Sequence, residues 1–208
     1  MFSKNELQNI ISGIGGGPES HFIQAEANYL RTCTQTGRAT QENKQPKETE
    51  EQSLISWISD NNFWFDHIDE ARYLTRGAEQ RVYLYQNTTH VLKLNDAIFY
   101  SNWTDYFHSL LTHNYFFPNT AYELLGFCLY ESVFHAVVKQ PYVTITSPTD
   151  LDKVKDFLLT NGFRVIRNND YVHDEWGIIL EDLHDENVLT NSGILFFIDT
   201  VFFLDWSI

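Results

Sequence analysis

Three oxygen-bearing side chains near the C-terminal end have types and spacing that suit phosphoryl transfer. Asp182 and Asn187 lie five positions apart in a polar stretch, and Asp199 follows twelve residues beyond Asn187. One carboxylate can orient an attacking hydroxyl group and accept its proton. An amide oxygen and a second carboxylate are hard ligands that suit Mg²⁺ beside phosphate groups. We therefore predict a catalytic role for Asp182 and metal-binding roles for Asn187 and Asp199.

The apolar runs beside these residues indicate two strands that would bring them together. Strands are predicted over 176–180 and 194–198, with a polar loop between them. Asp182 follows the first strand, and Asp199 follows the second. The three side chains are therefore expected at the mouths of adjoining strands.

The elements upstream give a mostly β half followed by a mixed half, which predicts an α+β fold. The sequence predicts a hairpin, a helix, two further strands and a capped helix, in this order: 81–85 with 90–94, 97–113, 122–129, 134–138 and 147–159. Gly77 lies just before the hairpin.

The first 53 residues differ from the rest of the chain. Short helices are predicted at 4–12 and 19–31, whereas 32–53 is polar, offers little to bury and predicts a flexible linker. We expect 1–53 to form a helical arm with its linker and 54–208 to form the main domain.

The stretch D-L-H-D-E-N-V-L from Asp182 to Leu189 resembles the catalytic loop D-L-K-P-E-N-[IL]-L of protein kinases, with the same Asp-to-Asn spacing. Asp199 falls where the metal-binding Asp of the D-F-G motif would lie. The order and lengths of the elements are most similar to the compact kinase-like domain of bacterial polyvalent proteins, which are associated with mobile elements and phages. The resemblance covers roughly 70–205.

This resemblance implies a nucleotide site that uses ATP and Mg²⁺. Gly77 would belong to a reduced glycine-rich loop, and Lys93 would contact the phosphates from its strand. Gln140 and Tyr142 would lie in the hinge that meets adenine, and His184 stands where kinases often place a lysine that contacts the transferring phosphate. The implied fold is a minimal kinase-like fold with a β-rich N-lobe and a truncated C-lobe that lacks the usual helical platform.

The sequence also departs from the kinase pattern. Leu180 and Glu181 replace the usual His-Arg before the catalytic Asp, and Thr200-Val201 replaces Phe-Gly after Asp199. No glutamate lies within 97–113 to pair with Lys93. Because Glu181 stands in place of the usual arginine, an activation segment clamped by that arginine is not expected.

Function is predicted as ATP- and Mg²⁺-dependent phosphate transfer to a hydroxyl group of a protein or a small molecule. One alternative is a pseudokinase that serves as a nucleotide-sensing or partner-binding module. Another is a metal-dependent phosphohydrolase, suggested by the dipeptides His173-Asp174 and His184-Asp185. Transfer of a nucleotidyl group, the identity of the acceptor and a homodimer that covers aromatic surface all stay open.

The composition of the chain limits which partners it can bind and indicates its cellular compartment. A formal net charge of −14 argues against broad binding to nucleic-acid phosphates or to anionic membranes. Cys33 and Cys128 are too far apart in sequence to indicate a disulfide framework or a zinc site. Neither a signal peptide nor a membrane-spanning run is evident. We expect a cytoplasmic protein.

Overall fold

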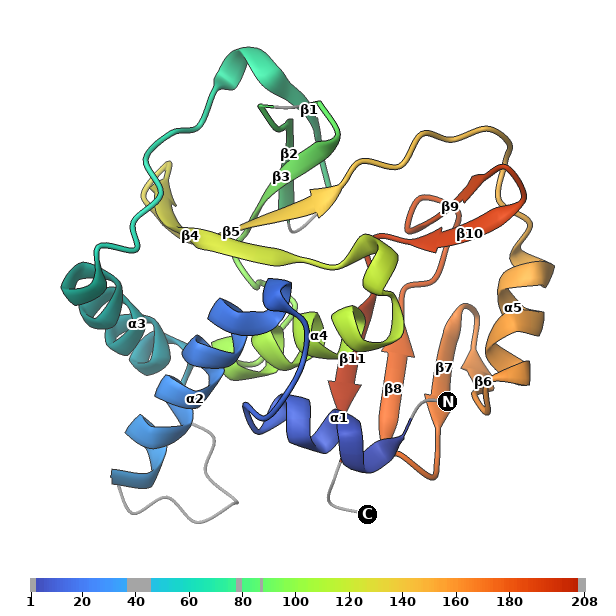
Figure 1. The fold of residues 1–208 in the computed structure, drawn as a ribbon, viewed down its shortest axis with the longest axis horizontal. Coiled ribbons are helices and arrows are strands. Elements are labelled where there is room, and N and C mark those ends of the chain that lie inside the picture. The colour runs from blue at the N-terminus through green and yellow to red at the C-terminus, as the bar shows by residue number, and fades with distance from the viewer. Residues whose placement is uncertain (1–2, 37–45, 78–79, 87, 206–208) are drawn as a thin grey trace.

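The computed structural model describes residues 3–36, 46–77, 80–86 and 88–205. Figure 1 shows an N-terminal sheet, a group of helices beside and below it, and a second group of strands formed by the C-terminal third of the chain. The fold is α+β, as predicted. Within the described ranges, no helix is long and apolar enough to cross a membrane.

The N-terminal sheet has five antiparallel strands in the order β1-β2-β3-β5-β4. Their bounds are β1 Tyr73–Arg76, β2 Gln80–Leu84, β3 His90–Asn95, β4 Glu123–Tyr130 and β5 Val133–Pro141. The predicted hairpin and the two later strands are confirmed, whereas β1 was not predicted. All four residues of β1 are exposed, so this edge strand carries no apolar face that a sequence pattern could reveal.

Helix α4, Trp103–Phe116, packs against the strand Val201–Leu204 and, through its aromatic rings, against Phe127 and Phe134 of this sheet. Its helix was predicted from residue 97 but begins later, because Asn95 and Asp96 accept hydrogen bonds from the backbone N–H groups of Ala97 and Ile98. These local bonds hold the backbone in turns rather than in a helix. The Asn102 side chain then caps α4 by accepting a hydrogen bond from the Asp105 N–H.

The C-terminal part contains one four-stranded sheet, a separate hairpin and helix α5. The elements are α5 Leu151–Thr160, β6 Arg164–Arg167, β7 Asp170–His173, β8 Ile178–Glu181, β9 Val188–Asn191, β10 Ile194–Phe197 and β11 Val201–Leu204. The sheet order is β11-β8-β7-β6, and β9 pairs with β10. The predicted strands and helix are confirmed, and the stretch 182–187 connects β8 to β9. A C-lobe shortened relative to other kinases stays a prediction.

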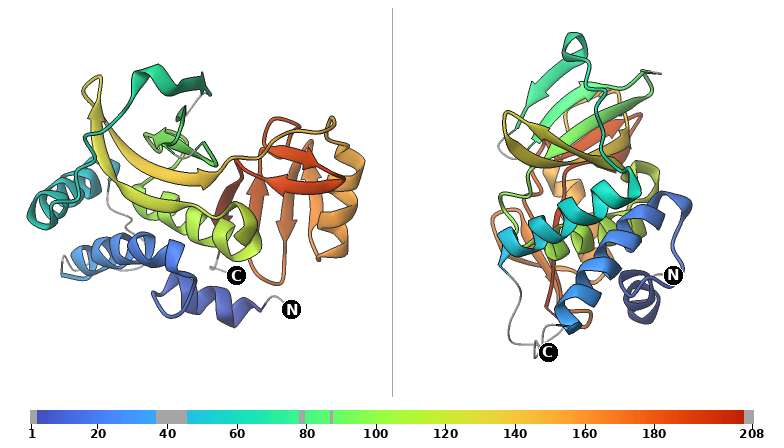
Figure 2. Two further views of the ribbon diagram at one scale, coloured as in Figure 1. Left: turned by 45° about the horizontal axis from the view of Figure 1, so that its top comes forward. Right: turned by 90° about the vertical axis from the view of Figure 1, so that its left-hand side faces the viewer.

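In the described part of the chain before the sheet lie the α-helices α1 Lys4–Ile11, α2 His21–Thr36 and α3 Lys47–Asn61. Figure 2 shows α2 and α3 side by side, and α2 packs on α4. Short 3₁₀ turns lie at Pro18–Ser20, Glu70–Arg72 and Pro118–Thr120.

The linker predicted over 32–53 is wrong in the parts that the structure describes, because 32–36 belong to α2, Pro46 precedes α3 directly and 47–53 belong to α3. The remainder, 37–45, lies outside the described residues. Helix α3 is held by tertiary contacts that a sequence pattern does not reveal. The Glu50 carboxylate accepts hydrogen bonds from the N–H groups of Trp103 and Thr104 at the start of α4. The Lys47 ammonium group donates to the carbonyls of Asp96 and Ala97.

The division between an arm and a domain at residue 53 stays a prediction, but the helices on both sides of it share one hydrophobic core. Leu7, Ile23, Leu54 and Phe107 are all fully or almost fully buried in the same cluster as the C-terminal strands. The side chains of α1 and α2 that are buried in this core contribute to the stability of the domain. In turn, these helices depend on the core, because isolated helices of this length are unstable.

Glu26 on α2 is fully buried, and neither of its carboxyl oxygens has a hydrogen-bond partner among the described residues. Burial raises its pKa to about 8. The folded state therefore keeps a proton that the unfolded state releases from about pH 4.5 upward, so stability falls as pH rises between about 4.5 and 8. Because Glu26→Met has no carboxyl group here, we expect most of this pH-dependent loss to disappear. The free energy of unfolding near pH 8 should differ from that of the wild type by a few kcal/mol. Urea unfolding across this pH range measures it.

Glu19→Gln, at an exposed position of the same region, is the matched control and should keep the pH dependence of the wild type. Equal pH profiles for Glu26→Met and the wild type would show that Glu26 is not the group responsible.

Candidate active site

A cleft of about 1100 Å³ lies between the five-stranded sheet and the C-terminal strands. All of the residues predicted to bind nucleotide, hold metal or act in catalysis line it: Gly77, Lys93, Gln140, Tyr142, Asp182, Asn187 and Asp199. The fold thus brings together positions that are up to 122 residues apart in the chain, from Gly77 to Asp199.

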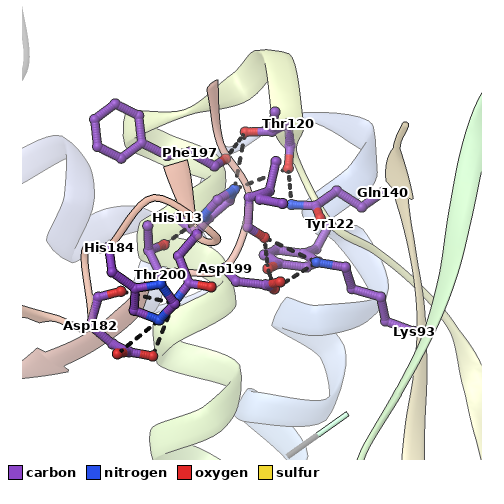
Figure 3. Close-up of polar contacts among 12 residues, drawn as sticks. Lys93, His113, Thr120, Tyr122, Gln140, Asp182, His184, Phe197, Asp199 and Thr200 are labelled. Atoms are coloured by element: carbon purple, nitrogen blue, oxygen red, sulfur yellow. Dashed lines mark hydrogen bonds and ion pairs between the residues drawn. The ribbon is translucent and has the colours of Figure 1, made fainter. Parts of the chain in front are cut away.

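Lys93 and Asp199, which both line this cleft, form an ion pair (Figure 3). The Lys93 Nζ lies 2.6 Å from Asp199 Oδ1 and donates a second hydrogen bond to the Ile198 carbonyl at 3.1 Å. The lysine side chain is 3% exposed, whereas that of Asp199 is 20% exposed. A charge so deeply buried needs a partner. Here Asp199 is that partner.

Asp182 and Asn187 are joined directly across the loop between β8 and β9. The Asn187 Nδ2 donates to the Asp182 carbonyl at 2.8 Å and to Asp182 Oδ2 at 2.9 Å. Since a carbonyl can only accept, the amide nitrogen must face Asp182 and the amide oxygen Oδ1 points away from it. The Asn187 carbonyl also accepts hydrogen bonds from the N–H groups of Ile198 and Asp199, so the amide and the second carboxylate are neighbours.

The backbone at Asp182 is held in the left-handed region, with φ of 64°. This conformation is unfavourable for a residue with a side chain and is maintained by its surroundings. The Asp182 N–H donates to Asp170 Oδ1 on β7 at 3.2 Å, and Asn187 fixes the carbonyl. The turn presents the Asp182 carboxylate to the cleft, where its side chain is 59% exposed.

His184 lies beside this carboxylate. Its Nδ1 accepts a hydrogen bond from the Glu186 N–H at 3.2 Å. Its Nε2 lies 3.3 Å from Asp182 Oδ1 and 3.2 Å from Asn187 Nδ2, so the ring contacts both members of this pair. Contact with a transferring phosphate stays a prediction for His184.

A family model described as "Serine/Threonine/Tyrosine Kinase found in polyvalent proteins" matches residues 47–206. The chain belongs to this family. The matched segment begins at the first residue of α3 and includes the whole cleft. No match was found among curated proteins or among solved structures.

In this kinase-like domain, a buried histidine fixes the residue that follows Asp199. His113 on α4 is fully buried, and its Nε2 lies 3.0 Å from the Thr120 carbonyl. Since that carbonyl can only accept, Nε2 carries the proton, and Nδ1 accepts from the Thr200 hydroxyl at 2.7 Å. Burial lowers the pKa of His113 to about 3, so the ring is neutral. Helix α4 is therefore linked to Thr200 through uncharged groups.

Tyr122 and Thr120 hold the preceding residues in the same way (Figure 3). The Tyr122 hydroxyl donates to the Ile198 carbonyl and lies 3.2 Å from Asp199 Oδ1. The Thr120 hydroxyl donates to the Phe197 carbonyl at 2.6 Å. Sequence reasoning missed His113, Thr120 and Tyr122 because each is separated from its partner in 197–200 by more than 75 residues.

Gln140 belongs to this network as well as to the cleft wall. Its side chain is buried, and its Nε2 donates to the Thr120 carbonyl at 2.8 Å. The amide is thus engaged behind the predicted hinge, and contact between Gln140 and adenine stays a prediction. Tyr142, just beyond β5, is half exposed and lines the cleft, and its backbone N–H donates to the Thr89 carbonyl at 2.9 Å.

Apolar side chains line the part of the cleft near the predicted hinge. Val82 and Val91 belong to the N-terminal sheet, and Leu189 belongs to β9 on the opposite side. Tyr142 and Val143 complete this end. A flat, largely apolar ring such as adenine suits this surface.

Gly77 lies at the turn between β1 and β2. Its N–H donates to the Gln80 carbonyl at 2.9 Å, and Ala78 and Glu79 lie outside the described residues. A methyl group added at Gly77 would meet no atom closer than 3.9 Å. The described part of the turn therefore does not need glycine for steric reasons, and a need for it would come from a ligand that approaches the backbone.

The described residues contain no group of three or more His, Cys, Asp or Glu side chains placed to hold a metal ion. The phosphohydrolase alternative therefore has no ligand set in this part of the chain. The pair Asn187 and Asp199 fits a different arrangement, in which Mg²⁺ takes one or two protein ligands and completes its shell with phosphate oxygens and water.

Proposed function

We propose that this chain binds ATP with Mg²⁺ in the cleft and transfers the γ-phosphoryl group to a hydroxyl group of a protein or a small molecule. Membership of the kinase family supports a phosphotransferase at a coarse level. The observation that carries the finer proposal is the direct pairing of Asp182 with Asn187 and of Lys93 with Asp199 at one cleft.

In the proposed complex, adenine lies in the apolar end of the cleft between Val82 and Leu189. The triphosphate then extends along the sheet toward Lys93 and past the turn at Gly77. Lys93 supplies positive charge to the phosphates, and the backbone at Gly77 permits their close approach. This orientation directs the terminal phosphate toward Asp182.

The Lys93–Asp199 pair is suited to the charges of Mg²⁺-ATP. Each member of the pair would find a new partner of opposite charge in the ligand, the phosphates for Lys93 and the cation for Asp199. Asn187 Oδ1 and Asp199 are the groups that would hold Mg²⁺, which supplies charge neutralisation at the phosphates when bound. Tyr122, Thr120 and His113 keep the segment 197–200 in place during this exchange.

Asp182 is the proposed general base. Its carboxylate accepts the proton of the acceptor hydroxyl as the new bond to phosphorus forms. Asn187 orients one carboxylate oxygen, and His184 lies beside the other. The base is therefore held in place before an acceptor arrives.

A nucleotide-sensing pseudokinase is a second candidate, favoured by the same ion pair. Asp199 contacts Lys93 directly, and α4 contributes a neutral histidine rather than an acid to this region. A protein of this kind would bind nucleotide and convert none.

The products of an incubation with ATP and Mg²⁺ separate these possibilities. We expect ADP to form, because the proposed base and metal ligands act on the terminal phosphate. AMP or an adenylylated protein would instead indicate nucleotidyl transfer, and binding without any product would indicate the pseudokinase. If ATP is neither bound nor consumed in the presence of Mg²⁺, the proposed function is wrong.

A further inference from the structure

Among the side chains that line the described part of the cleft, two carry a hydroxyl group, Thr75 and Tyr142. Tyr142 lies at the apolar end, where adenine is proposed to bind. Thr75 lies on β1, two residues before Gly77. We propose that Thr75 is itself a phosphate acceptor, modified by the cleft that it lines; this inference rests on the proposed function.

The sheet register places Thr75 in the same row as the phosphate-binding lysine. Thr75 pairs with Val82 on β2, and Val82 pairs with Lys93 on β3. Side chains at directly paired positions lie on the same face of a sheet. With neighbouring strands about 4.8 Å apart, the Cα atoms of Thr75 and Lys93 are about 10 Å apart. A triphosphate that contacts Lys93 therefore lies within reach of the Thr75 side of the cleft.

Thr75 is also accessible. The residue is exposed, and its hydroxyl makes no hydrogen bond to another described residue. Strand β1 is the edge of the sheet and pairs with β2 alone. Edge strands with few buried contacts open locally at low cost in free energy. The hydroxyl can thus approach a nucleotide without disturbance of the core.

The proposed step is an ordinary phosphoryl transfer. Thr75 Oγ1 forms a bond to the γ-phosphorus, and the bond from that phosphorus to the oxygen bridging the β- and γ-phosphates breaks. ADP leaves with that oxygen. The hydroxyl proton passes to the Asp182 carboxylate and then to water.

Modification at this place would limit further reaction. A phosphothreonine adds a charge of about −1.5 to −2 at pH 7. It would lie in the row that includes Lys93, where the phosphates of ATP are proposed to bind. We therefore expect at most one phosphoryl group per chain at Thr75, and about tenfold weaker ATP binding by the modified protein.

Intact mass and peptide mapping after incubation with Mg²⁺-ATP test the proposal. The wild type should gain one phosphoryl group at Thr75. Thr75→Val should gain none there, whereas Thr75→Ser keeps a hydroxyl and should be modified. Valine favours strands, so the first variant retains the local fold. Thr160→Val, the same exchange at an exposed site on α5, is the matched control and should be modified like the wild type.

The dependence on protein concentration tests whether the reaction is intramolecular. The fraction modified at a fixed time should not change on dilution. A fraction that falls on dilution would overturn the intramolecular step, and a phosphoryl group that stays on Thr75→Val at full yield would overturn the assignment of the residue.

Failure of this inference can be told apart from failure of the proposed function. If ATP is bound and ADP forms with no phosphate on Thr75, the inference is wrong and the proposed function stands. If calorimetry detects no binding of Mg²⁺-ATP to the unmodified wild type, both are wrong.

Discussion

Asp182→Asn is expected to lower the rate of phosphoryl transfer by about 10²- to 10⁴-fold, the range in which general bases contribute. Asparagine keeps the shape of the side chain and can still accept the hydrogen bond from Asn187 Nδ2. It cannot accept the proton of the acceptor hydroxyl. Mg²⁺-ATP binding should stay close to that of the wild type, because the role proposed for Asp182 is toward the acceptor and not toward the metal. ADP formation and nucleotide affinity, measured on the same preparation, check both parts.

Asp185→Asn provides the matched control. It makes the same chemical change three residues away, at an exposed position that does not line the cleft. This variant should keep wild-type rates. Wild-type turnover in Asp182→Asn, or loss of ATP binding in that variant, would contradict the role given to Asp182.

Asp199→Asn is expected to abolish Mg²⁺-dependent ATP binding and to lower the free energy of unfolding by about 3–5 kcal/mol. The second effect follows because the exchange removes the carboxylate that compensates the buried Lys93 ammonium group, and breaking one half of such a pair is costly. Lys93→Met combined with Asp199→Asn removes the stranded charge. The double variant should therefore recover most of the stability and none of the nucleotide binding.

A more exposed ion pair, on the sheet that contains Lys93, gives the comparison. Lys139 and Glu123 are also 2.6 Å apart, but their side chains are 23% and 38% exposed. Glu123→Gln should therefore cost no more than about 1 kcal/mol. Urea unfolding of the four proteins measures these differences. If Asp199→Asn is as stable as the wild type, Lys93 does not depend on Asp199 for its charge compensation.

The residues of the site were easier to predict from sequence than the contacts that hold them. The sequence identifies Asp182, Asn187 and Asp199 as candidates because their spacing is local and each adjoins an apolar strand. The strand around Lys93 is similarly visible, since β3 is apolar on both sides of the lysine. Their convergence on one cleft follows from the kinase-like order of the strands.

The missed features depend on partners far away in the chain. Helix α3 begins with polar residues, so its first turns show no apolar face. Glu50 nevertheless lies buried there because it accepts hydrogen bonds from the start of α4, more than 50 residues away. In the sequence, His113 is not distinguished from the other residues of an aromatic-rich helix. Its contact with Thr200 exists only in the folded chain. Pairings of this kind leave no periodic signal, and a single sequence does not reveal them.

The central claim is that the cleft binds ATP through Mg²⁺ held by Asn187 and Asp199. Calorimetric titration of ATP into the wild-type protein, with Mg²⁺ and with a chelator in its place, tests this claim most directly. We expect one ATP per chain with Mg²⁺ and much weaker binding with the chelator, and we expect Asp199→Asn to remove this difference. Binding that is equal with and without Mg²⁺, or no binding at millimolar ATP, would contradict it.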